Sequence, residues 1–175
     1  MSLGPRHKVA PRRRREGRTD YRTRLKLLKS GRPRAVVRFS ERRVIVALTA
    51  YDPKGDRVIA SAESRELTHI GFPAASLAST PASYLTGYLA GLRAKSAGAQ
   101  EAVLDVGIRR PSQGGRLLGA LRGLLDAGVT IPHGEGAFPS PERLNGKHLK
   151  TPLDRPLELF KQALPAYVAR PTGAA

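Results

Sequence analysis

The sequence predicts an α/β protein in which helices flank a mixed β-sheet, with a basic N-terminal arm and a C-terminal extension. Three segments rich in Val and Ile follow one another closely between residues 34 and 62. Two later segments carry apolar residues at helical spacing, and a short apolar segment at 102–106 lies between them. Strands and helices that alternate in this way typically form one sheet with helices packed against it.

The first three strands are expected at Arg34–Phe39, Arg43–Ala50 and Arg57–Ala62, paired as a meander. The segment Asp52-Pro53-Lys54-Gly55 suits a type I turn, with Asp at the first position, Pro at the second and Gly at the fourth. We attribute both Asp52 and the neighbouring Asp56 to this turn.

Two helices are expected to cover the sheet. The first begins with Thr80 as N-cap and Pro81 at N1, and it ends near Gly98. The second follows Pro111 and ends at Gly128. Their apolar faces are Leu85, Tyr88, Leu89 and Leu92 in the first, and Leu117, Leu121, Leu124 and Leu125 in the second. Residues 64–79 are expected to be irregular.

The chain beyond residue 133 is expected to be an appendage. It contains turns around Pro139 and Pro141 and then a short helix carrying Leu157, Phe160 and Leu164, which should end before Pro165. Residues 171–175 are expected to be disordered. The predicted domains are a basic arm at 1–17, an α/β core at 18–135 that includes a basic helix, and a C-terminal extension at 136–175.

The positive charge is concentrated at the N-terminal end. The whole chain carries 31 Lys and Arg against 14 Asp and Glu, a net charge of +17. Residues 1–43 alone hold 16 of the basic residues and 3 of the acidic ones. Residues 1–17 have almost no apolar side chains, so we expect this arm to become ordered only when it is bound. Such a segment attracts a polyanion, and nucleic acid is the expected partner.

A short basic helix is expected directly after the arm. Thr19 and Asp20 suit its N-terminus, and Gly31 ends it. Tyr21, Leu25 and Leu28 recur at helical spacing as an apolar stripe, whereas Arg22, Lys26 and Lys29 share another face. Tyr21 could therefore pack in the core or stack on a base.

Arg outnumbers Lys by 23 to 8, and the guanidinium group can bind a phosphate in two places or stack on a base. This preference favours structured nucleic acid as the partner. The candidate RNA-binding residues are Arg12, Arg13, Arg14, Arg15, Arg18, Tyr21, Arg22, Arg24, Lys26 and Lys29.

Other classes of function find little support. Cysteine is absent, and His7, His69, His133 and His148 are too widely spaced for a local metal motif, so neither a metal nor a cofactor is expected. No apolar run is long enough to span a bilayer. A nuclease could recruit Asp52, Asp56, Glu63 and Asp105, but Asp105 is better explained as a hydrogen-bonded structural acid in a strand. The segment His133-Gly134-Glu135 lacks a nucleophile at a recognisable spacing. A chromatin-like DNA-binding protein and a degenerate nuclease remain as alternatives.

Several segments resemble a known family. They are Arg13-Arg14-Arg15-Glu16-Gly17-Arg18-Thr19-Asp20-Tyr21-Arg22, Tyr51-Asp52-Pro53-Lys54-Gly55-Asp56, Thr80-Pro81-Ala82-Ser83-Tyr84-Leu85-Thr86-Gly87, Ala120-Leu121-Arg122-Gly123 with Asp126-Ala127-Gly128, and Ile131-Pro132-His133-Gly134-Glu135. Together they resemble the archaeal form of the large-subunit ribosomal protein eighteen family, over about residues 4–150. Gly115 and Leu118 depart from the family pattern, and the chain from about Thr151 matches it poorly.

The resemblance implies a ribonuclease H-like domain without an active site, and therefore a protein that is not an enzyme. It also implies a cytoplasmic, ribosomal location in the central protuberance of the large subunit. The implied partners are 5S rRNA, which the basic arm would bind, the large-subunit rRNA and neighbouring 5S-associated ribosomal proteins.

Overall fold

The sheet of this protein has four strands, in a computed structural model that describes residues 8–134, 136, 138–149, 153 and 155–168. The strands are β1 (Arg34–Phe39), β2 (Val44–Ala50), β3 (Arg57–Glu63) and β4 (Val103–Asp105). Their order is β3-β2-β1-β4, in which β1 to β3 form an antiparallel meander and β4 runs parallel to β1. This confirms the predicted mixed sheet and is consistent with the fold that the family resemblance implies.

The turn between β2 and β3 forms as predicted. The Gly55 N–H donates to the Asp52 carbonyl oxygen at 3.0 Å, and the Asp52 carboxylate accepts from the Lys54 N–H at 2.9 Å. The strand boundaries differ slightly from the prediction, since β3 continues to Glu63 and β4 comprises only Val103–Asp105. β4 is short because it pairs with only the first half of β1, opposite Arg34–Val36.

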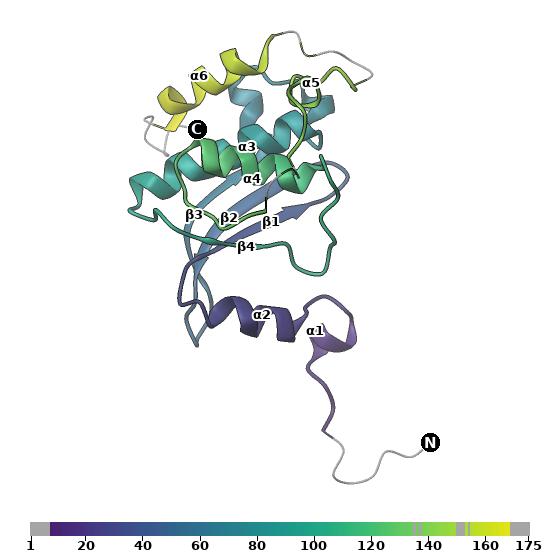
Figure 1. Cartoon of the computed structure of the whole chain (residues 1–175), viewed down its shortest axis with the longest axis vertical. Coiled ribbons are helices and arrows are strands. Elements are labelled where there is room, and N and C mark those ends of the chain that lie inside the picture. The colour runs from purple at the N-terminus through teal and green to yellow at the C-terminus, as the bar shows by residue number, and fades with distance from the viewer. Residues whose placement is uncertain (1–7, 135, 137, 150–152, 154, 169–175) are drawn as a thin grey trace.

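The helices α3 (Thr80–Ser96), α4 (Arg116–Asp126) and α6 (Leu157–Val168) lie on one side of the sheet (Figure 1). The α3 helix is buried on nearly all sides, because it contacts the sheet as well as α4 and α6. Its N-cap is Ser79, whose hydroxyl accepts from the Ala82 N–H, so the expected N-cap at Thr80 was wrong by one residue.

Residues 64–79 are more regular than expected. They form two 3-10 helices, η1 (Ser64–Ile70) and η2 (Ala74–Ser76). The Glu66 carboxylate accepts from the Glu63 N–H and so caps η1. It also pairs with Arg93 of α3 at 2.5 Å, which ties η1 to the helical layer. Contacts so distant in sequence are not visible as a local pattern.

The C-terminal segment packs on the body, which corrects the expected appendage. After the short helix α5 (Pro141–Leu144), the α6 helix buries Leu157, Phe160 and Leu164 in the main core. The α6 helix also continues through Pro165 to Val168 instead of ending before the proline. Proline removes one helical hydrogen bond, and the burial of Phe160 and Leu164 against the body offsets that loss. Residues 171–175 lie outside the described residues.

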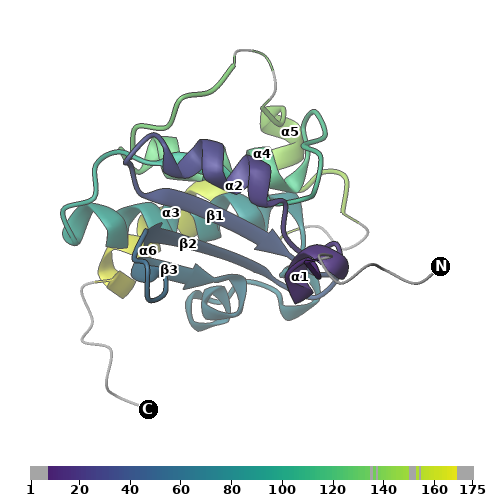
Figure 2. The same ribbon diagram turned by 90° about the horizontal axis from the view of Figure 1, so that it is seen from below.

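Two further helices lie on the other side of the sheet. These are α1 (Arg12–Arg15) and α2 (Tyr21–Leu28), which appear below the strands in Figure 1. Seen from below, α2 lies alongside β1, while β2 and β3 remain in view (Figure 2). The sheet thus has one face covered by the hydrophobic core and one face that the basic N-terminal region covers only in part.

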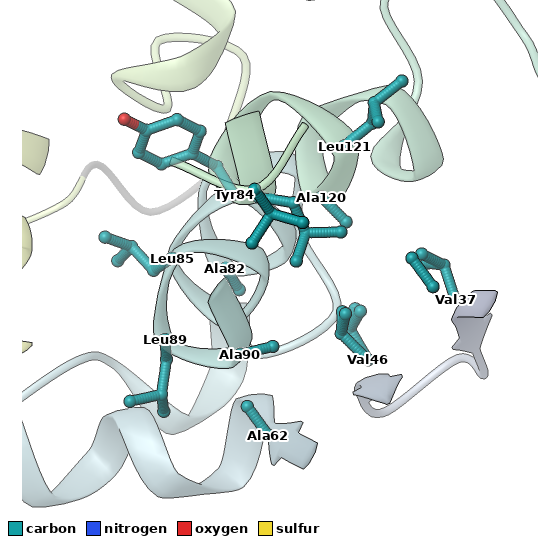
Figure 3. Close-up of a cluster of buried hydrophobic side chains, with 14 of the residues drawn as sticks. Val37, Val46, Ala62, Ala82, Tyr84, Leu85, Leu89, Ala90, Ala120 and Leu121 are labelled. Carbon is teal, nitrogen blue, oxygen red and sulfur yellow. The ribbon is translucent and has the colours of Figure 1, made fainter. Parts of the chain in front are cut away.

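The core lies between the sheet and the helices α3 and α4 (Figure 3), and residues of α6 extend it. The α3 and α4 helices approach closely because glycines face the opposite backbone. A Cβ atom at Gly123 would lie 2.1 Å from the Tyr84 carbonyl oxygen, and one at Gly87 would lie 2.1 Å from the Ala120 carbonyl oxygen. The distance between these two helices therefore depends on the absence of side chains at both positions.

We predict that Gly123→Ala lowers the free energy of unfolding by about 2 to 3 kcal/mol, because the added methyl group forces the two helices apart. Denaturant titration would measure the change. The matched control is Gly134→Ala, because no atom lies within 4 Å of that Cβ position and Gly134 has no positive φ. Equal stability of the two variants would contradict the close packing described here.

Candidate nucleic-acid interface

The arm residues Arg12–Arg15 form one helical turn, α1, and all four side chains are exposed. The sequence predicted that this arm would be without structure of its own. Local contacts account for the turn: Glu16 pairs with Arg12 at 3.4 Å and with Arg18 at 3.1 Å. The Arg13 Nε atom donates to the Thr19 hydroxyl at 2.9 Å. These contacts orient the arm without burying its guanidinium groups.

The α2 helix begins at a strong cap. The Asp20 carboxylate accepts from the Arg22 and Thr23 N–H groups, and the Thr23 hydroxyl donates to it at 2.6 Å. The hydrogen bonds from the side chain and backbone of Thr23 lower the pKa of Asp20 below its ordinary value. The cap therefore remains ionised and complements the positive end of the helix.

Of the predicted apolar stripe of α2, only Leu28 turns toward the body. Tyr21 and Leu25 are exposed, and the side chains that turn toward the body are those of Arg24, Leu27 and Leu28, which are only partly exposed. The charged side chains Arg34, Asp56 and Asp105 lie beneath α2, and a salt bridge from Arg24 to Asp56 takes the place expected for an apolar contact. Of the two roles considered for Tyr21, burial in the core is excluded.

Three arginines and two aspartates form a charge network between α2 and the sheet. Arg34 of β1 is 3% exposed and donates to Asp56 and, at 2.6 Å, to Asp105. Asp56 also accepts from Arg24 at 2.9 Å, and Asp105 from Arg38 at 3.1 Å. The sequence assigns Asp56 to the turn, but the structure shows a different role. Asp56 joins α2 to the sheet through its salt bridges with Arg24 and Arg34.

Asp105 is a structural acid, as predicted. Burial alone would raise its pKa, but hydrogen bonding and charge from Arg38, the Gly107 N–H group and Arg34 outweigh that effect, and the pKa falls below its ordinary value of 3.8. Asp56 and Asp105 were both considered as nuclease carboxylates. Each is instead occupied by guanidinium groups, which explains its position without any catalytic role.

Nine of the ten candidate RNA-binding residues are exposed to solvent, and Arg24 is the exception. Arg24 is partly buried and paired with Asp56. Its assignment to RNA stays a prediction, and an RNA phosphate would have to compete with Asp56 for its guanidinium group. Arg34, the centre of the network, was not predicted from the sequence. The available signal was an arginine at the first position of an apolar strand, where an unpaired charge would be costly.

His133 has a structural environment. Its Nδ1 atom lies 2.7 Å from the Ile131 carbonyl oxygen, and its ring meets Phe138 edge-on at 5.2 Å. Glu135, which was considered with it, lies outside the described residues. Within the described part of the chain, no group of three or more potential metal ligands occurs, and no helix is both long and apolar enough to cross a bilayer.

These features are typical of a basic α/β protein that binds nucleic acid. Two carboxylates pair with the arginines near the sheet, whereas the arginines of the short arm are exposed. A family model described as ribosomal large subunit proteins 60S L5 and 50S L18 matches residues 5–100 and 93–134. Together these two segments span every helix and strand from α1 to α4.

Two archaeal proteins are similar to the chain. The large ribosomal subunit protein uL18 of Methanoregula boonei is 48% identical over 149 residues, which cover 85% of this chain and 85% of that protein. The protein of the same name from Korarchaeum cryptofilum is 49% identical over 149 residues, which cover 85% of this chain and 76% of that protein. The chain therefore belongs to this family of large-subunit ribosomal proteins. Its members are structural constituents of the cytoplasmic ribosome and not enzymes.

We predict that Asp105→Asn lowers the free energy of unfolding at neutral pH by about 3 kcal/mol, because the substitution leaves the buried Arg34 with one carboxylate instead of two. RNA affinity should change little. A carboxyl group whose pKa is lowered by folding stabilises the fold at every pH above its ordinary pKa. This contribution is lost as the pH falls through the lowered pKa of the folded state. The unaltered protein should thus lose more stability than the variant as the pH falls below the ordinary value of 3.8, as thermal unfolding would show. Parallel pH profiles would contradict this role.

Proposed function

We propose that this protein binds 5S rRNA and attaches it to the large-subunit rRNA in the central protuberance of the ribosome. The observation that carries the proposal is the exposure of the arm: Arg12–Arg15, Arg18 and Arg22 all present their guanidinium groups to solvent. Neighbouring 5S-associated ribosomal proteins are the proposed protein partners. The similarity to archaeal uL18 proteins supports the ribosomal setting.

The arrangement of the arm suits RNA. Phosphate groups can accept from Arg14 and Arg15, which have no carboxylate partner within the described residues. The exposed ring of Tyr21 lies directly after the cap of α2 and is free to stack on an unpaired base. The face of α2 that carries Arg22, Lys26 and Lys29 is likewise exposed. Phosphate contacts would supply most of the affinity, and Tyr21 would add a contact to a base.

A chain beginning at Gly17 tests the arm. Among the described residues, none that precedes Arg34 is buried, so the shortened chain should keep its circular dichroism spectrum and its unfolding midpoint. Its affinity for 5S rRNA should fall at least about tenfold, or roughly 1.4 kcal/mol, because it has lost four clustered guanidinium groups. Filter binding or fluorescence anisotropy would measure the change. If the shortened chain binds as tightly as the whole protein, the arm is not the principal contact.

The salt dependence of binding tests the contribution of phosphates. Each neutralised phosphate of a duplex adds about 0.9 to the slope of log affinity against log salt concentration. Five to eight contacts would give a slope of roughly 4 to 7, and a slope near 1 would contradict a phosphate-dominated interface. Duplex DNA of matched length is the competitor, and a preference for it at equal salt would favour the DNA-binding alternative.

A further inference from the structure

A second group of arginines lies on the folded body, at the edge of the sheet where β1 and β4 end. Because these two strands are parallel, their carboxyl ends meet at the same edge. We call this group the carboxyl edge, and its members come from β1, the β1–β2 connection, the loop after β4 and the start of α4. They are Arg38, Arg42, Arg109, Arg110 and Arg116.

An aromatic ring holds two of these arginines in place. The guanidinium carbons of Arg109 and Arg116 each lie 4.6 Å from the centre of the Phe39 ring. Arg116 also donates to the Ser40 and Ala78 carbonyl oxygens, at 3.2 and 3.1 Å. Side chains fixed in this way lose little conformational freedom when they bind a ligand, unlike ordinary surface arginines.

Arg38 is held by the loop that follows β4. Its guanidinium group donates to the Asp105 carbonyl oxygen at 2.9 Å. The loop passes so close that a Cβ atom at Gly107 would lie 3.0 Å from the Arg38 Cζ atom, and Gly107 has a φ of 65°. The backbone thus makes room for this guanidinium group, about half of which remains exposed.

The carboxyl edge carries an excess of positive charge. Of its five arginines, only Arg38 pairs with a carboxylate within the described residues, and that carboxylate, Asp105, is shared with Arg34. Of the two neighbouring acids, Glu63 is occupied by Arg43, and Glu41 lies beside Arg42 in the β1–β2 connection. Arg42, Arg109 and Arg110 are exposed. A cluster of like charges with so few counter-charges repels itself unless an anion lies against it.

The carboxyl edge is continuous with the arm. Arg13 and Arg18 of the arm line the same cleft of about 480 Å³ as Arg38 and Gly107. An RNA bound to the arm would therefore lie beside Arg38, the arginine of the carboxyl edge that lines this cleft.

From these observations we infer that the carboxyl edge is a second RNA-binding surface, which contacts phosphates of the same RNA that the arm binds. The inference rests on the proposed 5S rRNA binding and adds residues of the body to it. The arm would supply contacts from its exposed helical turn, whereas Arg38, Arg109 and Arg116 of the carboxyl edge would supply contacts fixed before binding. Such fixed contacts orient the RNA relative to the sheet.

The test is a double substitution in the full-length protein, Arg42→Gln with Arg110→Gln. Both side chains are exposed and make no hydrogen bond or ion pair within the described residues, so the fold should be unaffected. The matched control is Lys95→Gln with Arg155→Gln, which removes the same charge from two exposed positions outside both surfaces. Thermal unfolding would verify that both variants are folded.

Binding to 5S rRNA should weaken about tenfold in the double variant, and the slope of log affinity against log salt should fall by about 1.8, since two phosphate contacts are lost. The control should change neither quantity appreciably. If the double variant and the control bind alike while both bind 5S rRNA specifically, the carboxyl edge faces something else, such as an acidic protein surface, and the inference is wrong. If the unaltered protein shows no preference for 5S rRNA over other RNA, the proposed function itself fails.

Discussion

Arg34 is the residue on which the arrangement of the polar half of the molecule depends. Its guanidinium group is buried on the face of the sheet opposite the core and needs carboxylate partners, because an unpaired buried charge is strongly destabilising. The partners come from two places far apart in sequence, Asp56 after the β2–β3 turn and Asp105 at the end of β4. Pairing with both fixes the position of β4 and of the turn relative to β1.

The same network extends to the arm. Asp56 accepts from Arg24, and this ion pair joins α2 to the sheet where no fully buried side chain of α2 does so. The orientation of α2, and of α1 before it, thus depends on a contact between charged groups. Positive charge is thereby used in two ways: arginines near the sheet are neutralised and serve the fold, while those farther out remain available to phosphate.

The hydrophobic half of the molecule depends on close packing. The α3 helix lies between the sheet and the outer helices, so almost all its sides are buried, and glycines at its contact with α4 let the two backbones approach. The α6 helix completes this layer with Phe160, whose ring meets Phe72 edge-on at 5.3 Å. The last described part of the chain therefore belongs to the same core as the sheet.

The sequence by itself determined the meander, its turn at Asp52-Pro53-Lys54-Gly55, the two long helices and the basic arm, because each has a local pattern of apolar, charged or turn-forming residues. It also determined the family, through motifs spread along the chain. Only the tertiary structure decided the roles of Asp56 and Arg24, the burial of α6 beyond Pro165 and the meeting of Arg109 and Phe39. These features join residues that are distant in sequence, and the pairing of such residues depends on packing that no local pattern records.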